Sequence, residues 1–520
     1  MLIEQSAYAN RWRKVSPAAK GLFALCGLVA AFVARTPSAA AGVAVLISLT
    51  GWLGAGIPPG RWLRVAAPAL TFLAIGSLSL LVSPVFDAQG WRVVWLPVGT
   101  SPFFQLLGRS TAALTALLFL VMTTPLIDLI AVLRRLRLPE ILLELMVICY
   151  RMLFVLSGAL HDTLTAQASR LGYATPRLAL RSLGQLAAGL TLQIWSRARL
   201  AHRGAFTQQR RPHAFSRDTF RAHPPASSAG RGRRFRAHIH GVHIMTANLL
   251  EFRNVAYRYP DGSIGLDGCS FGVPVGARNA LLGANGAGKT TLFQHANGLL
   301  KPASGTVLYA GAPLDYGRAG LRQLRADVGL VFQNPDRQLF SASVREDVSF
   351  GPLNLGLDIE TVRQRVDTAL AAVRLSHCAD KAVHNLSFGQ KKRVCIAGVL
   401  AMSPRLLILD EPMAGLDNAM REELLVVLDS LQANGMTLLL ATHDIDFAYR
   451  WADHIHVIAA GRCLASFAAI ELPAHLDALA AARLNPPGII ELHRRLVTRG
   501  ILPANEQPRS LQELNVLLES

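Results

Sequence analysis

The stretch GANGAGKT at Gly283–Thr290 decides the fold of the second half of this 520-residue chain. Its spaced glycines, lysine and threonine follow the pattern of a phosphate-binding loop. An apolar, strand-like run (ARNALL) precedes it, and a run with helical character (TLFQHANGLL) follows it. Backbone N–H groups around the glycines can close on phosphate oxygens, and the new helix N-terminus adds the positive end of its dipole. The stretch therefore predicts a strand, a loop and a helix that bind a nucleoside triphosphate.

Individual roles follow from the chemistry of this loop. We expect Lys289 to reach the β- and γ-phosphates and the hydroxyl of Thr290 to ligate Mg²⁺. The other residues expected to contact the nucleotide here are Gly283, Asn285, Gly286, Gly288 and Thr291. ATP and Mg²⁺ are thus the predicted substrate and cofactor.

A second element, LLILDE at Leu406–Glu411, is typical of a buried parallel strand that ends in two acids. Asp410 at the strand end is placed to hold Mg²⁺ through water. Glu411 is placed to polarise the attacking water as a general base. The alternative, a core strand that merely ends in acids, is weakened because Pro412 and then AGLD follow.

The stretch LSFGQKKR at Leu386–Arg393 resembles the LSGGQ signature of ABC ATPases, with Phe388 in place of a glycine. In that family the signature of one nucleotide-binding domain closes on the γ-phosphate bound by another, a role the resemblance gives to Ser387, Gly389 and Gln390. It also implies a Mg²⁺-sensing Q-loop residue, a switch histidine, a D-loop aspartate and an adenine-stacking tyrosine. Gln333 is the expected Q-loop residue, His443 the switch histidine and Asp417 the D-loop aspartate. Tyr259 is the expected adenine-stacking residue, and Tyr257 is the other candidate for that role.

The first 210 residues have a different composition. They contain few acids, and apolar runs lie between basic clusters; the clearest are Gly21–Ala34, Ser38–Ile57, Val65–Val85, Thr111–Leu133 and Ile141–Leu160. The whole chain is 51% hydrophobic with a net charge of +19, and its mean hydropathy is +0.31. A basic excess fits nucleic-acid binding or the cytoplasmic side of a membrane protein. The apolarity favours the membrane, so we expect a lipid bilayer as partner and no nucleic acid.

Basic residues set the expected orientation. Arg11, Arg13 and Lys14 precede the first apolar run, which predicts a cytoplasmic N-terminus. The stretch Phe86–Gln105 then lies outside, with Trp91 and Trp95 as interfacial anchors. Whether Ile141–Leu160 spans the membrane or lies along its surface is left open.

Further stretches resemble energy-coupling-factor (ECF) importers, in which a transmembrane T component works with ABC ATPases. In the ATPase half the resemblance lies in FQNPDRQLFSASVREDVSFGPLN at Phe332–Asn354, and in the membrane half in Ala7–Lys20 and Thr123–Leu156. AQASRLGY and AHRGAF are similar to that family's two coupling motifs, which implies that Arg170 and Arg203 dock into the ATPase dimer.

The same resemblance implies a separate substrate-binding S component in the membrane. It also implies a second nucleotide-binding domain, from another copy or a separate ATPase. The cargo is expected to be cobalt or nickel, because the membrane half is most similar to T components of that group. Biotin or another vitamin is the alternative cargo, and an ABC ATPase acting on nucleic acid is the remote alternative.

The expected organisation therefore has four parts. An all-α polytopic membrane domain with cytoplasmic coupling helices covers residues 1–210, and a basic linker rich in His, Arg, Pro and Ser covers 211–247. An α/β P-loop ABC ATPase domain covers 248–472, and a helical tail covers 473–520. We expect a multi-pass protein of the bacterial inner membrane with its ATPase domain in the cytoplasm.

Overall fold

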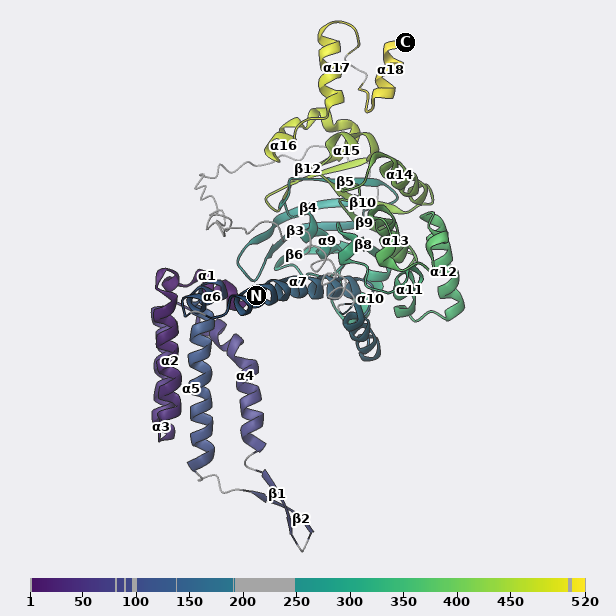
Figure 1. Ribbon diagram of the computed structural model, residues 1–520. Coiled ribbons are helices and arrows are strands. Elements are labelled where there is room, and N and C mark those ends of the chain that lie inside the picture. The colour runs from purple at the N-terminus through teal and green to yellow at the C-terminus, as the bar shows by residue number, and fades with distance from the viewer. Residues whose placement is uncertain are drawn as a thin grey trace. The chain divides into compact units, whose positions relative to one another are not determined.

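The computed structural model describes residues 2–79, 82–87, 90–95, 101–136, 138–189, 191, 248–503 and 507–519 (Figure 1). The predicted linker over 211–247 and the predicted coupling residue Arg203 lie outside these residues. By its internal contacts the chain divides into two compact units, Met1–Val155 and Leu156–Ser520.

The first unit is mostly helical, as predicted, with one two-stranded sheet among the described residues. Its helices begin with α1 (Leu2–Ala9) and a 3-10 turn (Arg11–Lys14), followed by α2 (Pro17–Val33) and α3 (Pro37–Leu49), which a π-helical turn extends over Thr50–Gly54. They continue with α4 (Pro59–Ser79), α5 (Ser101–Thr123), α6 (Leu126–Arg135) and α7 (Glu140–Ser169), the last of which reaches into the second unit. Proline at the first position starts α2 and α3, where its missing N–H costs no hydrogen bond.

Among the described residues, two helical stretches, Pro37–Gly54 and Phe103–Thr123, are long and apolar enough to cross a membrane. Helix α2 is a shorter apolar helix. The stretch Ile141–Leu160 lies within the single continuous helix α7.

Two predicted apolar runs prove not to be single helices. In the run Val65–Val85, α4 ends at Ser79, and β1 (Val82–Asp87) pairs antiparallel with β2 (Gly90–Trp95). The β-branched valines around Pro84 favour an edge strand over a helix. The run Thr111–Leu133 is divided between α5 and α6 because Pro125 disfavours helical backbone at the residue before it. Helix α5 begins at Ser101, inside the stretch that was expected to lie outside the membrane.

The N-terminal polar stretch is fixed by the break between α5 and α6. The side chains of Asn10 and Lys20 both donate to the backbone oxygen of Thr123, at 3.2 and 3.0 Å. Arg13 forms an ion pair with Asp128 on α6. These bonds satisfy a helix-end carbonyl that the break leaves without its usual partner.

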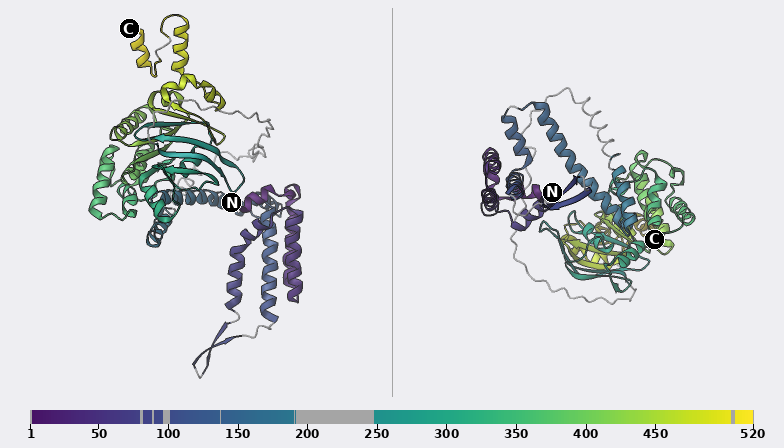
Figure 2. Two further views of the ribbon diagram at one scale, coloured as in Figure 1. Left: turned by 180° about the vertical axis from the view of Figure 1, so that it is seen from behind. Right: turned by 90° about the horizontal axis from the view of Figure 1, so that it is seen from below.

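The second unit contains a six-stranded and a four-stranded sheet, whose strands are drawn in Figure 2. The larger has the order β12-β11-β5-β10-β9-β8, and all neighbours are parallel except β12, which is antiparallel to β11. Its strands are β5 (Arg278–Leu282), β8 (Val328–Val331), β9 (Leu406–Asp410), β10 (Thr437–Thr442), β11 (His454–Ala459) and β12 (Arg462–Ala468). Every residue of β9 and β10 is buried, as expected for central parallel strands covered on both faces.

The smaller sheet is antiparallel, with the order β4-β3-β6-β7. It comprises β3 (Asn248–Arg258), β4 (Ile264–Pro274), β6 (Ser304–Tyr309) and β7 (Ala312–Pro313). Helix α9 (Lys289–Ala296) follows β5 directly after the phosphate-binding loop, so the predicted strand, loop and helix are present.

The second unit contains further helices beside the larger sheet (Figure 1). They are α10 (Arg318–Asp327), a 3-10 turn (Pro335–Arg337), α11 (Val344–Asn354), α12 (Ile359–Ala372), short turns at Ser376–Cys378 and Val383–Asn385, α13 (Phe388–Leu400), α14 (Asn418–Ala433) and α15 (Ile445–Trp451). Residues 176–189 form a further helix after α7.

The 3-10 segment Ala469–Ala474 leads into the tail, which contains the helices α16 (Leu476–Ala481), α17 (Gly488–Thr498) and α18 (Leu511–Glu519). The tail packs on the ATPase core through Leu479, Ile489, Ile490 and Leu514. Arg509 donates from Nε to the backbone oxygen of Tyr449 at 2.8 Å.

Candidate nucleotide site and its mechanical connections

The phosphate-binding loop has a backbone that requires glycine. Gly286 and Gly288 adopt φ values of +79° and +108°, which other residues rarely adopt. A Cβ on Gly288 would lie 2.7 Å from the backbone oxygen of Gly265, and one on Gly283 would lie 2.6 Å from that of Ile458. Asn285, between these glycines, is exposed. The loop thus leads from β5 into the N-terminus of α9, an arrangement suited to phosphate.

Lys289, the first residue of α9, is buried. Its Nζ donates to the backbone oxygen of Gly283 at 2.6 Å and lies 3.3 Å from Oε1 of Glu411. The ammonium is therefore held at the mouth of the loop, between the backbone that would enclose phosphate and the predicted general base.

Thr290 and Asp410 meet across the site: the Thr290 hydroxyl donates to Oδ2 of Asp410 at 2.6 Å. Burial raises the pKa of Asp410, against the lowering effect of the Thr290 hydrogen bond. A buried carboxylate beside a hydroxyl supplies the oxygen ligands that Mg²⁺ prefers, and a cation would offset the cost of burying its charge. These two residues therefore fit the metal, with Gln333 as the third candidate ligand.

Glu411 is the point where the predicted catalytic residues converge. Its Oε2 accepts from Nε2 of Gln333 at 3.2 Å and lies 3.3 Å from Nδ1 of His443. The Glu411 side chain is 8% exposed, whereas that of His443 is 62% exposed. Glu411 also has a φ of +46°, a conformation that non-glycine residues adopt only when their surroundings hold them there.

Tyr259 lies at the edge of the loop. Its hydroxyl is 2.7 Å from Oγ1 of Thr291, and its ring meets that of Tyr257 edge-on at 5.2 Å. Tyr257 also packs against His295, at 4.9 Å. Of the two tyrosines predicted as candidates for adenine stacking, Tyr259 is therefore the one hydrogen-bonded to Thr291, directly after the phosphate-binding loop.

The signature residues start a helix rather than joining this cluster. Ser387 caps α13: its side chain accepts from the backbone N–H of Gln390, and the Gln390 side chain accepts from that of Ser387. Gly389 is buried, and a Cβ there would lie 2.6 Å from Sδ of Met420. Asp417 caps α14 by accepting from Met420 N at 2.8 Å. Ser387 and Asp417 are exposed, so both are available to a second domain.

A cavity of about 480 Å³ adjoins the site. Its lining combines the predicted Mg²⁺ ligands, the signature phenylalanine and the end of α7: His161, Asp162, Thr165, Thr290, Gln294, Phe332, Gln333, Asn334, Arg337, Phe388, Asp410, Ala414 and Gly415. Asp162 of α7 lies 3.3 Å from Nε of Arg337. The end of α7 therefore borders the nucleotide site directly.

Arg170, at the end of α7, forms a buried joint with the ATPase core. Its Nη1 donates to Oδ1 of Asp347 at 2.6 Å and to the backbone oxygen of that residue at 3.3 Å. The two side chains are 1% and 0% exposed. Oδ2 of Asp347 accepts from the backbone N–H groups of Phe340 and Ser341, at 3.0 and 3.2 Å. The resemblance implied that Arg170 docks into the ATPase dimer, but nothing in the sequence identified Asp347 as its partner.

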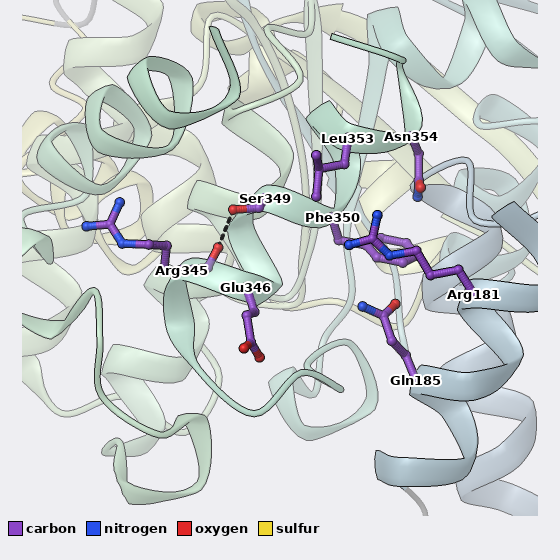
Figure 3. A pocket seen from close by; sticks show the side chains of 8 residues that line it. All are labelled: Arg181, Gln185, Arg345, Glu346, Ser349, Phe350, Leu353 and Asn354. Carbon is purple, nitrogen blue, oxygen red and sulfur yellow. Dashed lines mark hydrogen bonds between the residues drawn. The ribbon is translucent and has the colours of Figure 1, made fainter. Parts of the chain in front are cut away.

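A second cavity, of about 270 Å³, lies beside this joint (Figure 3). Arg181 and Gln185 of the 176–189 helix extend toward Phe350 of α11, and Arg345, Glu346 and Ser349 also line the cavity. Asn354, which also lines it, donates from Nδ2 to the backbone oxygen of Arg170 at 2.9 Å.

Sequence reasoning also missed Lys392. This residue of α13 is 3% exposed and donates to backbone oxygens in the loop that follows Glu411. The signature motif assigns no role to a lysine at this position, so only its burial in the structure indicates that Lys392 is a functional candidate.

Comparison with known proteins assigns the two halves separately. The profile of the family described as "ABC transporter" matches residues 266–414, and that described as "Cobalt transport protein" matches residues 9–205. The energy-coupling factor transporter ATP-binding protein EcfA of Methanocaldococcus jannaschii is 44% identical over 255 residues, which are 49% of this chain and 91% of that protein. The cobalt import ATP-binding protein CbiO of Rhodobacter capsulatus is 46% identical over 267 residues, 51% of this chain and 95% of that protein.

A solved structure, that of cbiO1 from Clostridium perfringens, described as part of the ABC transporter complex cbiONQ, is 41% identical. It matches 52% of this chain and 99% of its own, with a TM-score of 0.42. From the two family matches and the two relatives, each covered over more than 90% of its own length, the chain belongs to the ABC transporter family, as an ECF-type importer component in which a cobalt-transport-type helical domain and an ABC ATPase are fused in one polypeptide.

Proposed function

We propose that this chain is the ATP-driven energy-coupling module of an importer for cobalt or nickel ions, working with a separate substrate-binding membrane protein. The observation that carries the proposal is the agreement between the two halves. The helical half matches the cobalt transport protein family, and the ATPase half is 46% identical to a relative named as a cobalt import ATP-binding protein.

The hydrolytic step is assigned to residues that already converge. Glu411 is assigned the role of general base, because Gln333 donates to its Oε2 and Nδ1 of His443 lies 3.3 Å from the same oxygen. Lys289, at the N-terminus of α9, supplies positive charge where phosphate oxygens gather. When bound at Thr290 and Asp410, Mg²⁺ neutralises charge on the phosphates. The adenine is assigned to the Tyr259 ring.

A second nucleotide-binding domain completes the site in this proposal. Ser387 and Asp417 are exposed and directed by helix caps rather than by contacts with the phosphate loop of their own chain. We assign Ser387, Gly389 and Gln390 to the nucleotide of a second domain, supplied by another copy or by a separate ATPase.

Transmission to the membrane domain is assigned to Arg170. Gln333 donates a hydrogen bond to Glu411. The backbone after Gln333 passes through the turn Pro335–Arg337 to Phe340, and the Phe340 N–H donates to Asp347. Asp347 in turn holds Arg170. A shift of Gln333 during turnover therefore has a short, packed route to the end of α7. Arg203 is proposed as the equivalent contact for the second ATPase domain.

The proposed location is a bacterial inner membrane, crossed several times by the region over residues 1–210, with the ATPase domain over 248–472 in the cytoplasm. The basic residues that precede α2 support this orientation. The segment 211–247 serves as a tether, and 473–520 as a packed appendage of the ATPase.

The test is uptake into proteoliposomes that contain the chain with or without candidate substrate-binding proteins. Radioactive cobalt, nickel and biotin are offered side by side, and the matched control is Glu411→Gln. We expect ATP hydrolysis in all wild-type samples but metal uptake only with a substrate-binding partner. Strong metal uptake by the chain alone would refute the division of labour, and biotin uptake in place of metal would refute the assigned cargo.

A further inference from the structure

The loop that follows Glu411 is held by one helix of the same domain. Glu411 begins a tight turn, in which Ala414 N donates to the Glu411 backbone oxygen at 3.2 Å. The turn continues to Gly415, which has a φ of +75°. Two of its residues thus have a left-handed backbone, so the position of Glu411 depends on what fixes the turn from outside.

Lys392 makes the polar part of that attachment. Its Nζ donates to the backbone oxygens of Glu411, Pro412 and Ala414, at 3.2, 2.7 and 2.7 Å. An ammonium has three N–H donors, so all three are used on this one turn. Because the side chain is 3% exposed, water does not compete for them.

Phe388 makes the apolar part. It lies four residues before Lys392 on α13, and residues at that spacing share one face of a helix. The Lys392 ammonium lies 5.4 Å from the centre of its ring, within the range of a cation–π interaction. The ring covers Gly415, where an added Cβ would lie 3.0 Å from a ring carbon. Phe388, which replaces the signature glycine, therefore also packs against the turn at Gly415.

We propose that Phe388 and Lys392 form a clamp that fixes the Glu411–Gly415 turn to α13 and so positions the general base for hydrolysis. Ser387 caps the same helix at its exposed N-terminus. The clamp thus connects Glu411, which acts on the nucleotide bound by its own domain, to the signature residue Ser387. In the proposed function, Ser387 contacts the nucleotide bound by the second domain. Lys392 is a positioning residue in this scheme, since it reaches only backbone oxygens of the turn.

This inference rests on the proposed role of Glu411, and the variants separate the two. The full-length chain is reconstituted in nanodiscs with Lys392→Met, Lys392→Arg, Phe388→Gly and Glu411→Gln, and with Lys381→Met as the control at an exposed lysine of the same domain. Turnover of Mg-ATP and binding of a fluorescent ATP analogue are both measured.

We expect Lys392→Met to bind the analogue within about twofold of wild type but to lose about 100-fold in kcat, because small displacements of a catalytic group have effects of that size. Lys392→Arg should recover part of the loss, since it restores charge and donors but not the three-pronged geometry. Phe388→Gly should lower kcat with the affinity unchanged, and Lys381→Met should match wild type.

Wild-type kcat in Lys392→Met, alongside an inactive Glu411→Gln, would overturn the clamp and leave the general base intact. Parallel loss of analogue binding and turnover would also overturn it, because the lysine would then support the whole fold. Normal turnover in Glu411→Gln would refute the proposed role of Glu411 instead.

Discussion

The buried pair Arg170–Asp347 should respond asymmetrically to the loss of either partner. In Arg170→Met, the Asp347 carboxylate keeps two backbone N–H donors, from Phe340 and Ser341. In Asp347→Ala, the hydrogen-bond acceptor left to the guanidinium is a backbone oxygen at 3.3 Å, and the Phe340 ring lies 5.9 Å from its central carbon. Its Nε and Nη2 are already buried without a hydrogen-bond partner. An uncompensated buried charge costs about 3–5 kcal/mol. We therefore expect Asp347→Ala to approach that cost and Arg170→Met to stay well below it.

The cost can be measured at the joint itself. Cys395 lies beside the pair and is fully buried, which raises the pKa of its thiol. With the exposed Cys26 and Cys149 replaced by serine, a thiol-reactive dye reports opening of the ATPase core during heating. A loss of about 3 kcal/mol should lower the midpoint by about 5 °C or more. Arg181→Met, at an exposed arginine on the neighbouring helix, is the matched control.

The double variant Arg170→Met/Asp347→Ala completes a thermodynamic cycle. Removing both charges should be less damaging than Asp347→Ala alone, with a coupling energy of about 2 kcal/mol or more. Arg170→Met should retain ATP hydrolysis and lose uptake. Equal midpoints in both single variants, or a larger loss in Arg170→Met, would refute the electrostatic reasoning. Normal uptake in Arg170→Met would refute the coupling role.

Three further outcomes follow from the site. Glu411→Gln should keep nucleotide binding and lose about 1,000-fold in turnover, measured by phosphate release; a loss of binding instead would contradict its assignment as base. Gly398→Val should expel Arg170, because a Cβ at Gly398 lies 3.1 Å from its Nη1; faster dye labelling of Cys395 with retained hydrolysis is expected, and unchanged labelling would count against it. Burial lowers the pKa of Lys392 to about 8, so its ammonium loses a proton as the pH rises through that value. Wild-type kcat should then fall, while Lys392→Arg keeps its kcat to higher pH. Identical pH profiles of the two proteins would contradict a role of the Lys392 charge in turnover.

The parts of the site that sequence predicted are those formed within short segments. The phosphate loop lies between one strand and one helix, so its composition specified its structure. The partner of Arg170 is different, because Asp347 lies 177 residues away and nothing in either segment specifies the pairing. Lys392 shows a second limit: its neighbours in the sequence suggest a surface helix, and only the turn that packs on α13 makes it a buried cation.

The membrane half was harder to predict because hydropathy alone does not locate helix ends. The Val65–Val85 run is apolar throughout, yet its last residues pair as a strand with the segment after Asp87. Conversely, the basic residues near the N-terminus were interpreted as orientation signals. The structure shows that Arg13 is paired with Asp128, so a residue interpreted as an orientation signal also has a packing role.

Fusion changes what the Arg170 joint must achieve. Between separate subunits, a buried arginine has to offset both its desolvation and the entropy of association, and desolvation alone can cancel the gain from pairing. Here Arg170 and Asp347 belong to one polypeptide, so the joint forms at an effective concentration in the millimolar range rather than at cellular protein levels. A pair of modest net stability therefore suffices to stay closed. That allows the guanidinium to keep two unpartnered nitrogens, which a dissociable interface would tolerate less readily. If Arg170 has the proposed coupling role, the joint therefore stays closed through repeated turnover.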